Sequence, residues 1–102
     1  METNPTTETI INALNPALAP WGTKAIVADI GGGCAAIVID VPTGGEIIIT
    51  DAEDGIAPDA STTSITVGLY GDDHGDPIRH AVVPVLDLGT LSFTLDAFLL
   101  GQ

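Results

Sequence analysis

The chain has 102 residues, a hydrophobic fraction of 45% and a formal net charge of −12, with 14 acidic residues against Lys24 and Arg79. This length suffices for one domain with a single core that needs no disulfide or metal, and a mean hydropathy of +0.42 excludes a disordered acidic tail. With so few basic residues, counterion release contributes almost nothing to nucleic-acid binding, and the negative charge repels anionic membranes. We therefore expect one acidic globular domain with no nucleic-acid or membrane partner.

Several sequence features favour a cytoplasmic location. Cys34 is the only cysteine, so no disulfide can form within the chain and no secreted disulfide framework is present. The N-terminal stretch METNPTTETI lacks the basic start and the apolar block of a signal peptide. The longest apolar runs, such as residues 34–39, are far too short to span a bilayer.

The N-terminal segment predicts a helix over about Pro5–Leu14. Asn4 is a good N-cap, and Pro5 suits the first helical position. Apolar residues share one face at helical spacing: Ile10, Ile11 and Leu14, with Leu18 as an extension. Pro16 and Pro20 are expected to limit the helix. Trp21, the only tryptophan, is expected to pack over the core edge where the helix leads into the sheet, rather than to stack on a ligand.

Residues 24–51 are the most apolar part of the chain and predict three strands, at about 24–30, 34–41 and 46–51. The glycine run 31–33 precedes a strand and no Lys-Ser/Thr pair, so it predicts a hairpin turn and not a phosphate-binding loop. Ile47, Ile48 and Ile49 are consecutive, so the third strand presents apolar groups on both faces. We expect a second helix, a long loop or another subunit to cover the second face.

The rest of the chain predicts two further strands and a second helix. The strands are expected over about 62–70 and 78–85, each preceded by an acidic loop, at 51–61 and 71–77, and Pro84 indicates an edge position for the last strand. Residues 88–100 fit both helical and strand spacing, and we favour a helix over about Thr90–Leu100. The expected fold class is therefore α+β: an N-terminal helix, a mainly antiparallel meander of about five strands, and a C-terminal helix packing on the sheet.

Both acidic loops gather side chains that could bind a cation. The loop 71–77 holds three carboxylates and an imidazole: Asp72, Asp73, His74 and Asp76. Hard cations such as Ca²⁺ use clustered carboxylates, but the EF-hand order with its final glutamate is absent. The loop 51–61 holds a similar cluster: Asp51, Glu53, Asp54 and Asp59. Hydrated side chains are the ordinary interpretation of both clusters, so no metal is expected, and cation binding by the Asp72–Asp76 loop is the alternative.

The sequence contains no catalytic constellation. Cys34 has no CxxC partner, which predicts a small buried hydrophobe, and His80 is expected to be a partly exposed strand residue. Among 14 acidic residues, no single pair points to glycoside or general acid–base chemistry. We therefore expect a protein that is not an enzyme, holds no cofactor and acts by binding.

The function expected is interaction with a protein partner that has a basic surface. Spaced carboxylates can imitate the phosphates of a nucleic acid, as phage DNA-mimic and anti-defence proteins do, and opposite charge speeds encounter. This likeness is one of charge alone. The residues expected to contact the partner are the loop carboxylates: Asp51, Glu53, Asp54, Asp59, Asp72, Asp73 and Asp76. The alternatives are a structural module that assembles as a homodimer through the second apolar face of the sheet, and the metal-binding domain described above.

Overall fold

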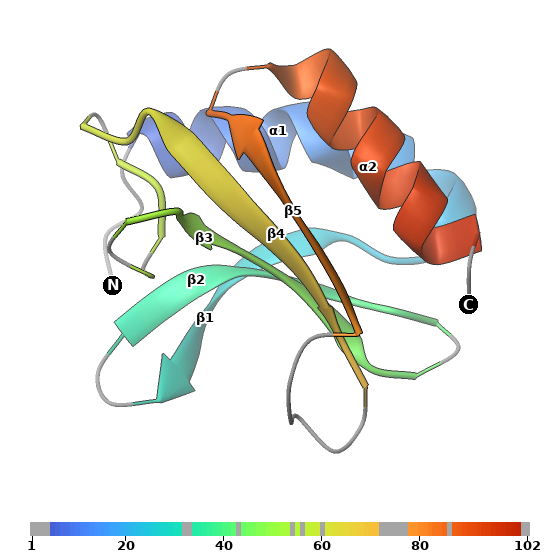
Figure 1. Ribbon diagram of the computed structural model, residues 1–102. Helices are drawn as coiled ribbons and strands as arrows, with labels where there is room; N and C mark the ends of the chain where they lie inside the picture. Colours follow the sequence, from blue (N-terminus) through green and yellow to red (C-terminus); the bar gives the residue numbers. More distant parts are fainter. Residues whose placement is uncertain are drawn as a thin grey trace.

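The computed structural model describes residues 5–31, 34–42, 44–53, 55, 57–59, 61–71, 78–85 and 87–100. In chain order its elements are α1 (Pro5–Leu18), the short 3-10 helix η1 (Ala19–Trp21), β1 (Ala25–Gly31), β2 (Cys34–Asp40), β3 (Glu46–Asp51), β4 (Ser64–Tyr70), β5 (Arg79–Pro84) and α2 (Leu88–Leu100). Sheet order follows chain order, and every neighbouring pair of strands is antiparallel. The predicted α+β meander is confirmed (Figure 1).

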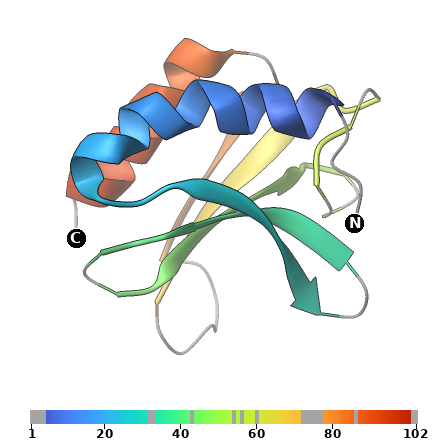
Figure 2. The same ribbon diagram turned by 180° about the vertical axis from the view of Figure 1, so that it is seen from behind.

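Both helices lie on the same face of the sheet, as Figure 1 and Figure 2 show from opposite sides. The side chains buried between the two layers are nearly all aliphatic, and include Ile10, Leu14, Leu18, Ile37, Ile39, Ile47, Ile49, Ile65, Val67, Leu69, Leu91 and Leu95. Burying one such side chain stabilises the fold by about 1.5–3 kcal/mol relative to leaving it exposed. This single layer of contacts therefore holds the helices to the sheet. Neither of the two helices described is long and apolar enough to cross a membrane.

Helix α1 continues beyond the predicted end at Leu14, through Pro16 to Leu18, the residue that the sequence offered as an extension. Pro16 is exposed, so its ring lies on the solvent side of the helix. A proline removes one helical hydrogen bond, but Leu18 is only 1% exposed, and its burial favours the extra turn. The prediction that Pro16 would limit the helix is wrong. Trp21 is partly buried and packs against the core, as predicted.

Residues 88–100 are helical, which decides between the two spacings that the sequence allowed. Leu91 and Leu95 are buried while Phe93 between them is 75% exposed, and a strand would place all three on one face. The helix begins at Leu88, earlier than predicted, because Asp87 caps it. The Asp87 carboxylate accepts hydrogen bonds from the Thr90 N–H at 3.2 Å and from the Thr90 hydroxyl at 2.8 Å.

The two edges of the sheet are β1 and β5, and the edge position that Pro84 predicted for β5 is confirmed. Within β3, Ile47 and Ile49 are fully buried against the helices, while Ile48 points to the other face and is half-buried. No described helix or strand covers that other face. The expectation of a second covering element is therefore not met within the described residues, because both helices compete for the same side.

The turn between β2 and β3 needs glycine at position 45. Gly45 has a φ of +80°, and a Cβ atom built there would lie 2.2 Å from the carbonyl oxygen of Tyr70. Its own carbonyl accepts a hydrogen bond from the Val41 N–H at 3.1 Å. Gly22 offers a comparison, because its φ is +75° and nothing lies within 4 Å of the same built atom.

We expect Gly45→Ala to destabilise the fold more than Gly22→Ala does. Both variants place a Cβ atom at positive φ, which costs about 1–2 kcal/mol. Only Gly45→Ala also forces the turn away from the Tyr70 carbonyl, and such overpacking adds about 1–3 kcal/mol. Urea unfolding followed by Trp21 fluorescence measures both losses, and equal losses would contradict this account of the turn.

Candidate functional site

Asp51, one of the predicted partner-binding acids, lies inside the fold at the end of β3. Its side chain is buried, at 7% exposure. One carboxylate oxygen accepts a hydrogen bond from the Glu53 N–H at 2.7 Å, and the other accepts one from the Thr62 hydroxyl. The carboxylate thus joins the two ends of the loop between β3 and β4 and satisfies polar groups that would be costly to bury alone.

Asp59 organises the same loop from its far side. Its carboxylate accepts hydrogen bonds from the Ser61 N–H at 2.8 Å and the Ser61 hydroxyl at 2.6 Å, and its own N–H donates to the Thr62 hydroxyl at 2.9 Å. The Ser61 hydroxyl and then the Ser61 N–H lower the pKa of Asp59 below its usual 3.8, because both bonds favour the charged carboxylate. Asp59 therefore acts within the loop as an acceptor that shapes a turn.

The loop is also tied to the rest of the fold. The buried Thr7 hydroxyl of α1 donates to the Pro58 carbonyl at 2.6 Å, and the Ala57 N–H donates to the Ala35 carbonyl of β2 at 2.8 Å. These bonds hold the middle of the loop against α1 and β2. The loop is consequently part of the scaffold along the residues that carry these contacts.

The remaining predicted acids divide into two groups. Glu53 is exposed to solvent and can meet a partner. Four of the predicted acids lie outside the described residues: Asp54, Asp72, Asp73 and Asp76. The structure therefore brings Asp51, Glu53 and Asp59 into one loop, and partner binding by the loop carboxylates stays a prediction.

A second candidate surface is the face of the sheet that points away from the helices, which we call the open face (Figure 1, Figure 2). Paired residues of antiparallel strands share a face, so the register defines its rows. The middle row contains Ile26, Val38, Ile48, Gly68 and His80. On either side lie a row of Thr50, Thr66 and Val82 and a row of Asp40, Glu46 and Tyr70. The open face is thus apolar across its middle, with hydroxyls along one side and carboxylates along the other.

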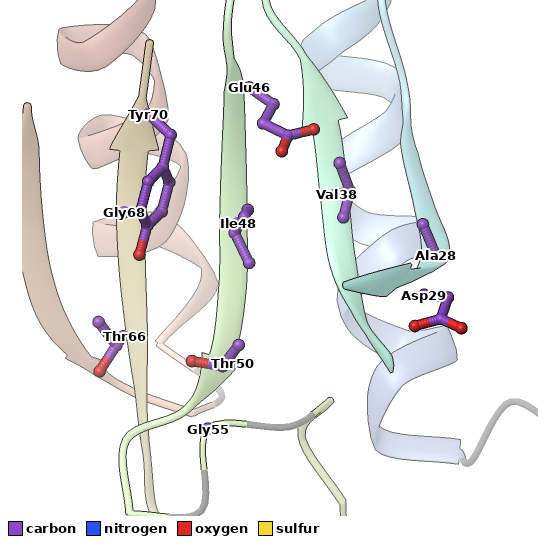
Figure 3. A pocket seen from close by; sticks show the side chains of 10 residues that line it. All are labelled: Ala28, Asp29, Val38, Glu46, Ile48, Thr50, Gly55, Thr66, Gly68 and Tyr70. Atoms are coloured by element: carbon purple, nitrogen blue, oxygen red, sulfur yellow. The ribbon is translucent and has the colours of Figure 1, made fainter. Parts of the chain in front are cut away.

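A hollow of about 620 Å³ lies over this face and is lined from four strands and from Gly55 of the loop. Figure 3 shows Val38 and Ile48 at its floor, with the Glu46 carboxylate directed in from β3. Thr50 and Thr66 line the hollow near the end where Gly55 lies. Apolar floor and polar rim together form the arrangement expected of a binding surface.

Tyr70 closes one side of the hollow by lying along its own strand. A Cβ atom built on Gly68 would come within 2.8 Å of the Tyr70 ring, so the absence of a side chain at Gly68 makes room for that ring (Figure 3). The aromatic ring covers backbone that a glycine leaves bare. It also presents a large, rigid side chain with a hydroxyl, a type enriched at protein interfaces.

Carboxylates dominate the charge of the open face. Asp40 and Glu46 are directly opposite each other on β2 and β3, and Asp40 is exposed. Like charges placed opposite one another in a sheet repel each other, and both attract a cationic group.

The other reactive side chains form no second centre. Cys34 is half-buried and opposite Gly31, more accessible than predicted, and it is a free thiol. His80 is exposed and opposite Gly68, close to the prediction. Among the described residues no group of three or more His, Cys, Asp or Glu side chains is placed to hold a metal ion. The loop proposed for cation binding, 72–76, lies outside them.

In comparisons with known proteins, no family model, no curated protein and no solved structure matches the chain. The sequence predicted the open face only in part. The run Ile47–Ile49 indicated a second apolar face, but the partners of Ile48 come from register across the sheet, which no local pattern specifies. The motif Gly68-x-Tyr70 is a second local signal that points to this face.

We expect Ser61→Ala to raise the pKa of Asp59 toward 3.8, because it removes the hydroxyl that contributes most to the lowered value. A folded pKa below the unfolded one means that Asp59 stabilises the fold above the unfolded pKa. That stabilisation is lost as the pH falls through the folded pKa, so Ser61→Ala should lose it at a higher pH. Titration of the side-chain carboxyl carbon by NMR measures the pKa. Thr63→Ala is the control, and an unchanged Asp59 pKa in Ser61→Ala would contradict the assignment.

Proposed function

We propose that this protein is a non-enzymatic interaction protein that binds a basic surface of a protein partner through the open face of its sheet. The observation that carries the proposal is the hollow over an apolar floor of Val38 and Ile48, with the carboxylate of Glu46 in its lining and that of Asp40 opposite Glu46 on the neighbouring strand. The apolar floor supplies burial, while the carboxylates supply direction and partner choice.

The charge of the whole chain supports a basic partner over a second copy. Each chain carries −12, so two copies meeting face to face would also oppose the carboxylates of Asp40 and Glu46 to each other. A basic partner is attracted by the negative electrostatic potential of this protein, and this attraction raises the rate of association. One observation favours the homodimer: Ile26 and Val82 on this face are 43% and 62% exposed, and a second copy could bury them.

The class of partner that we propose is a nucleic-acid-binding protein. Its basic surface is built to meet phosphates, and carboxylates held on a rigid sheet can occupy the same positions. The exposed carboxylate of Glu53 would extend the acidic border beyond the open face. Binding would then block the nucleic-acid site of the partner.

The variant Asp40→Lys separates binding from folding. It converts the like-charge pair with Glu46 into an opposite-charge pair, so stability should be kept or rise by about 0.2–1 kcal/mol. Binding to a basic partner should nevertheless fall by at least about tenfold, corresponding to ~1.4 kcal/mol. Asp96→Lys is the matched control, because Asp96 is an exposed acid on α2, on the opposite side of the sheet.

The measurement is capture of partners from a lysate of the source cells by the immobilised wild type and both variants. We expect a basic protein that is retained by the wild type and Asp96→Lys, is lost from Asp40→Lys, and is released by salt well above about 0.1 M. Equal capture by all three proteins, or capture insensitive to salt, would overturn the proposal. A doubled mass of the isolated protein would favour the homodimer instead.

A further inference from the structure

The outer edge of β1 faces a groove instead of another strand. The groove has a volume of about 450 Å³ and lies between α1 and β1. Its walls are Glu8, Ile11 and Asn12 of α1 and residues 25–29 of β1. Figure 2 shows α1 running above β1 along this side of the molecule.

Hydrogen bonds on both sides of β2 fix which way the backbone of β1 points. The Val41 N–H donates across the β2–β3 turn to the Gly45 carbonyl. In an antiparallel sheet the backbone of successive residues bonds alternately to the two neighbouring strands, so Ile39 bonds to β3 and Val38 bonds to β1. Val38 therefore bonds to its partner Ile26, and the next residue along β1, Ala25, is expected to direct its N–H away from β2. The hydrogen bond from the Ala25 N–H to the Asn15 side chain, at 2.8 Å, confirms this direction.

By the same alternation, Val27 directs its N–H and C=O into the groove. No described residue forms a hydrogen bond with these outward groups of Val27. Edges of this kind are usually blunted by proline, by charge or by a bulge. The irregularity in β1 comes only between Asp29 and Gly31, so residues 25–29 keep a regular edge.

The opposite edge of the sheet differs. Strand β5 ends in Pro84, and the Arg79 side chain donates to the Ala97 carbonyl of α2 at 3.4 Å. Proline cannot donate to an added strand, and α2 contacts β5. Pro84 and the contact with α2 therefore make the β5 edge a poorer site for an added strand than the β1 edge.

The side chains around the groove define the chemistry of its occupant. Ile11 and Val27 give an apolar centre between helix and strand. Asn15 lies beside Ala25, so α1 runs antiparallel to β1 and places Glu8 at the same end of the groove as Asp29. An occupant with apolar side chains in the middle and a cationic side chain at that end complements both features. A second copy of this chain would bring its own Glu8 and Asp29 to the same edge.

We propose that the β1 edge binds an extended segment of a protein partner as an added strand, with apolar side chains against Ile11 and Val27 and a Lys or Arg beside Glu8 and Asp29. Backbone hydrogen bonds to Val27 supply affinity, and the alternating side chains supply selection. This surface adjoins the open face along β1, but Glu8, Ile11 and the outward backbone groups of Val27 belong to the groove alone, so either proposal can fail without the other.

The probe for this proposal is the capped peptide acetyl-Lys-Thr-Val-Thr-Val-Thr-Lys-amide, added to the ¹⁵N-labelled full chain. It places lysines and valines on one side of a strand and threonines on the other. We expect saturable shifts of the amides of residues 11–12 and 25–29, and amide exchange of Val27 slowed by about fivefold, the factor for one typical hydrogen bond.

Two modified peptides test strand addition without changing the protein. One carries N-methyl groups on the valines and the other on the threonines. Since alternate residues of an added strand donate to β1, one modified peptide should bind at least about tenfold more weakly and the other should bind nearly as the parent does. Equal binding by the two, shifts centred on Ile48 and Thr66, or no saturable binding would overturn the proposal.

Protein variants complete the test. Val27→Pro removes the outward N–H at a position where an edge strand tolerates proline, and should abolish binding, whereas Val27→Thr keeps the N–H and should retain it. Glu8→Gln should weaken binding severalfold, with Asp96→Asn as the control at an exposed acid of α2 outside the groove. If Val27→Pro fails to fold, the methylated peptides on the wild type decide.

Discussion

One-sided burial of the sheet is the constraint on which the rest of the structure depends. The meander puts the alternating isoleucines, valines and leucines of β2, β3 and β4 on a single face, and α1 and α2 both pack there. Each buried side chain contributes about 1.5–3 kcal/mol, so the helices have no comparable gain from lying on opposite faces. The face that remains has enough apolar character to bind and enough polar character to stay hydrated. Val38 and Ile48 give the first property, and Thr50, Thr66, Asp40 and Glu46 give the second.

We propose that charge and exposed backbone give the two candidate surfaces different selectivities. On the open face, the carboxylates opposite each other would favour a cationic surface with an apolar patch. On the β1 edge, the outward backbone N–H and C=O of Val27 would pair with an extended segment. Glu8 and Asp29 would favour a cationic side chain at one end of that segment. A partner could engage both surfaces at once because Ile26 and Ala28 belong to the open face and also border the groove. Linked contacts of this kind raise affinity without additional contact area at either surface.

The elements were largely predictable from the sequence, because hydrophobic periodicity and turn residues act locally. The strand bounds follow from the apolar runs and from glycine turns such as Gly44-Gly45, and Pro84 correctly indicated an edge. One error came from a tertiary contact, because burial of Leu18 carries α1 through Pro16. The other was a missed local signal, because Asp87 caps α2 by accepting hydrogen bonds from Thr90, three residues further on. The candidate site was less predictable, since Asp51 and Asp59 look like surface acids until Thr62 and Ser61 are seen to bond to them. Which residues share a face with Ile48 depends on long-range register.

The three consecutive isoleucines of β3 allow the most direct test of the one-sided sheet. Methyl-labelled protein is titrated with an uncharged gadolinium chelate, and paramagnetic relaxation of each isoleucine methyl is measured by NMR. Ile47 and Ile49 are fully buried and Ile48 is half-buried on the other face. We expect strong relaxation of the Ile48 methyl groups and little effect on those of Ile47 and Ile49. Equal protection of all three residues would show that the open face is covered in solution and would contradict the account.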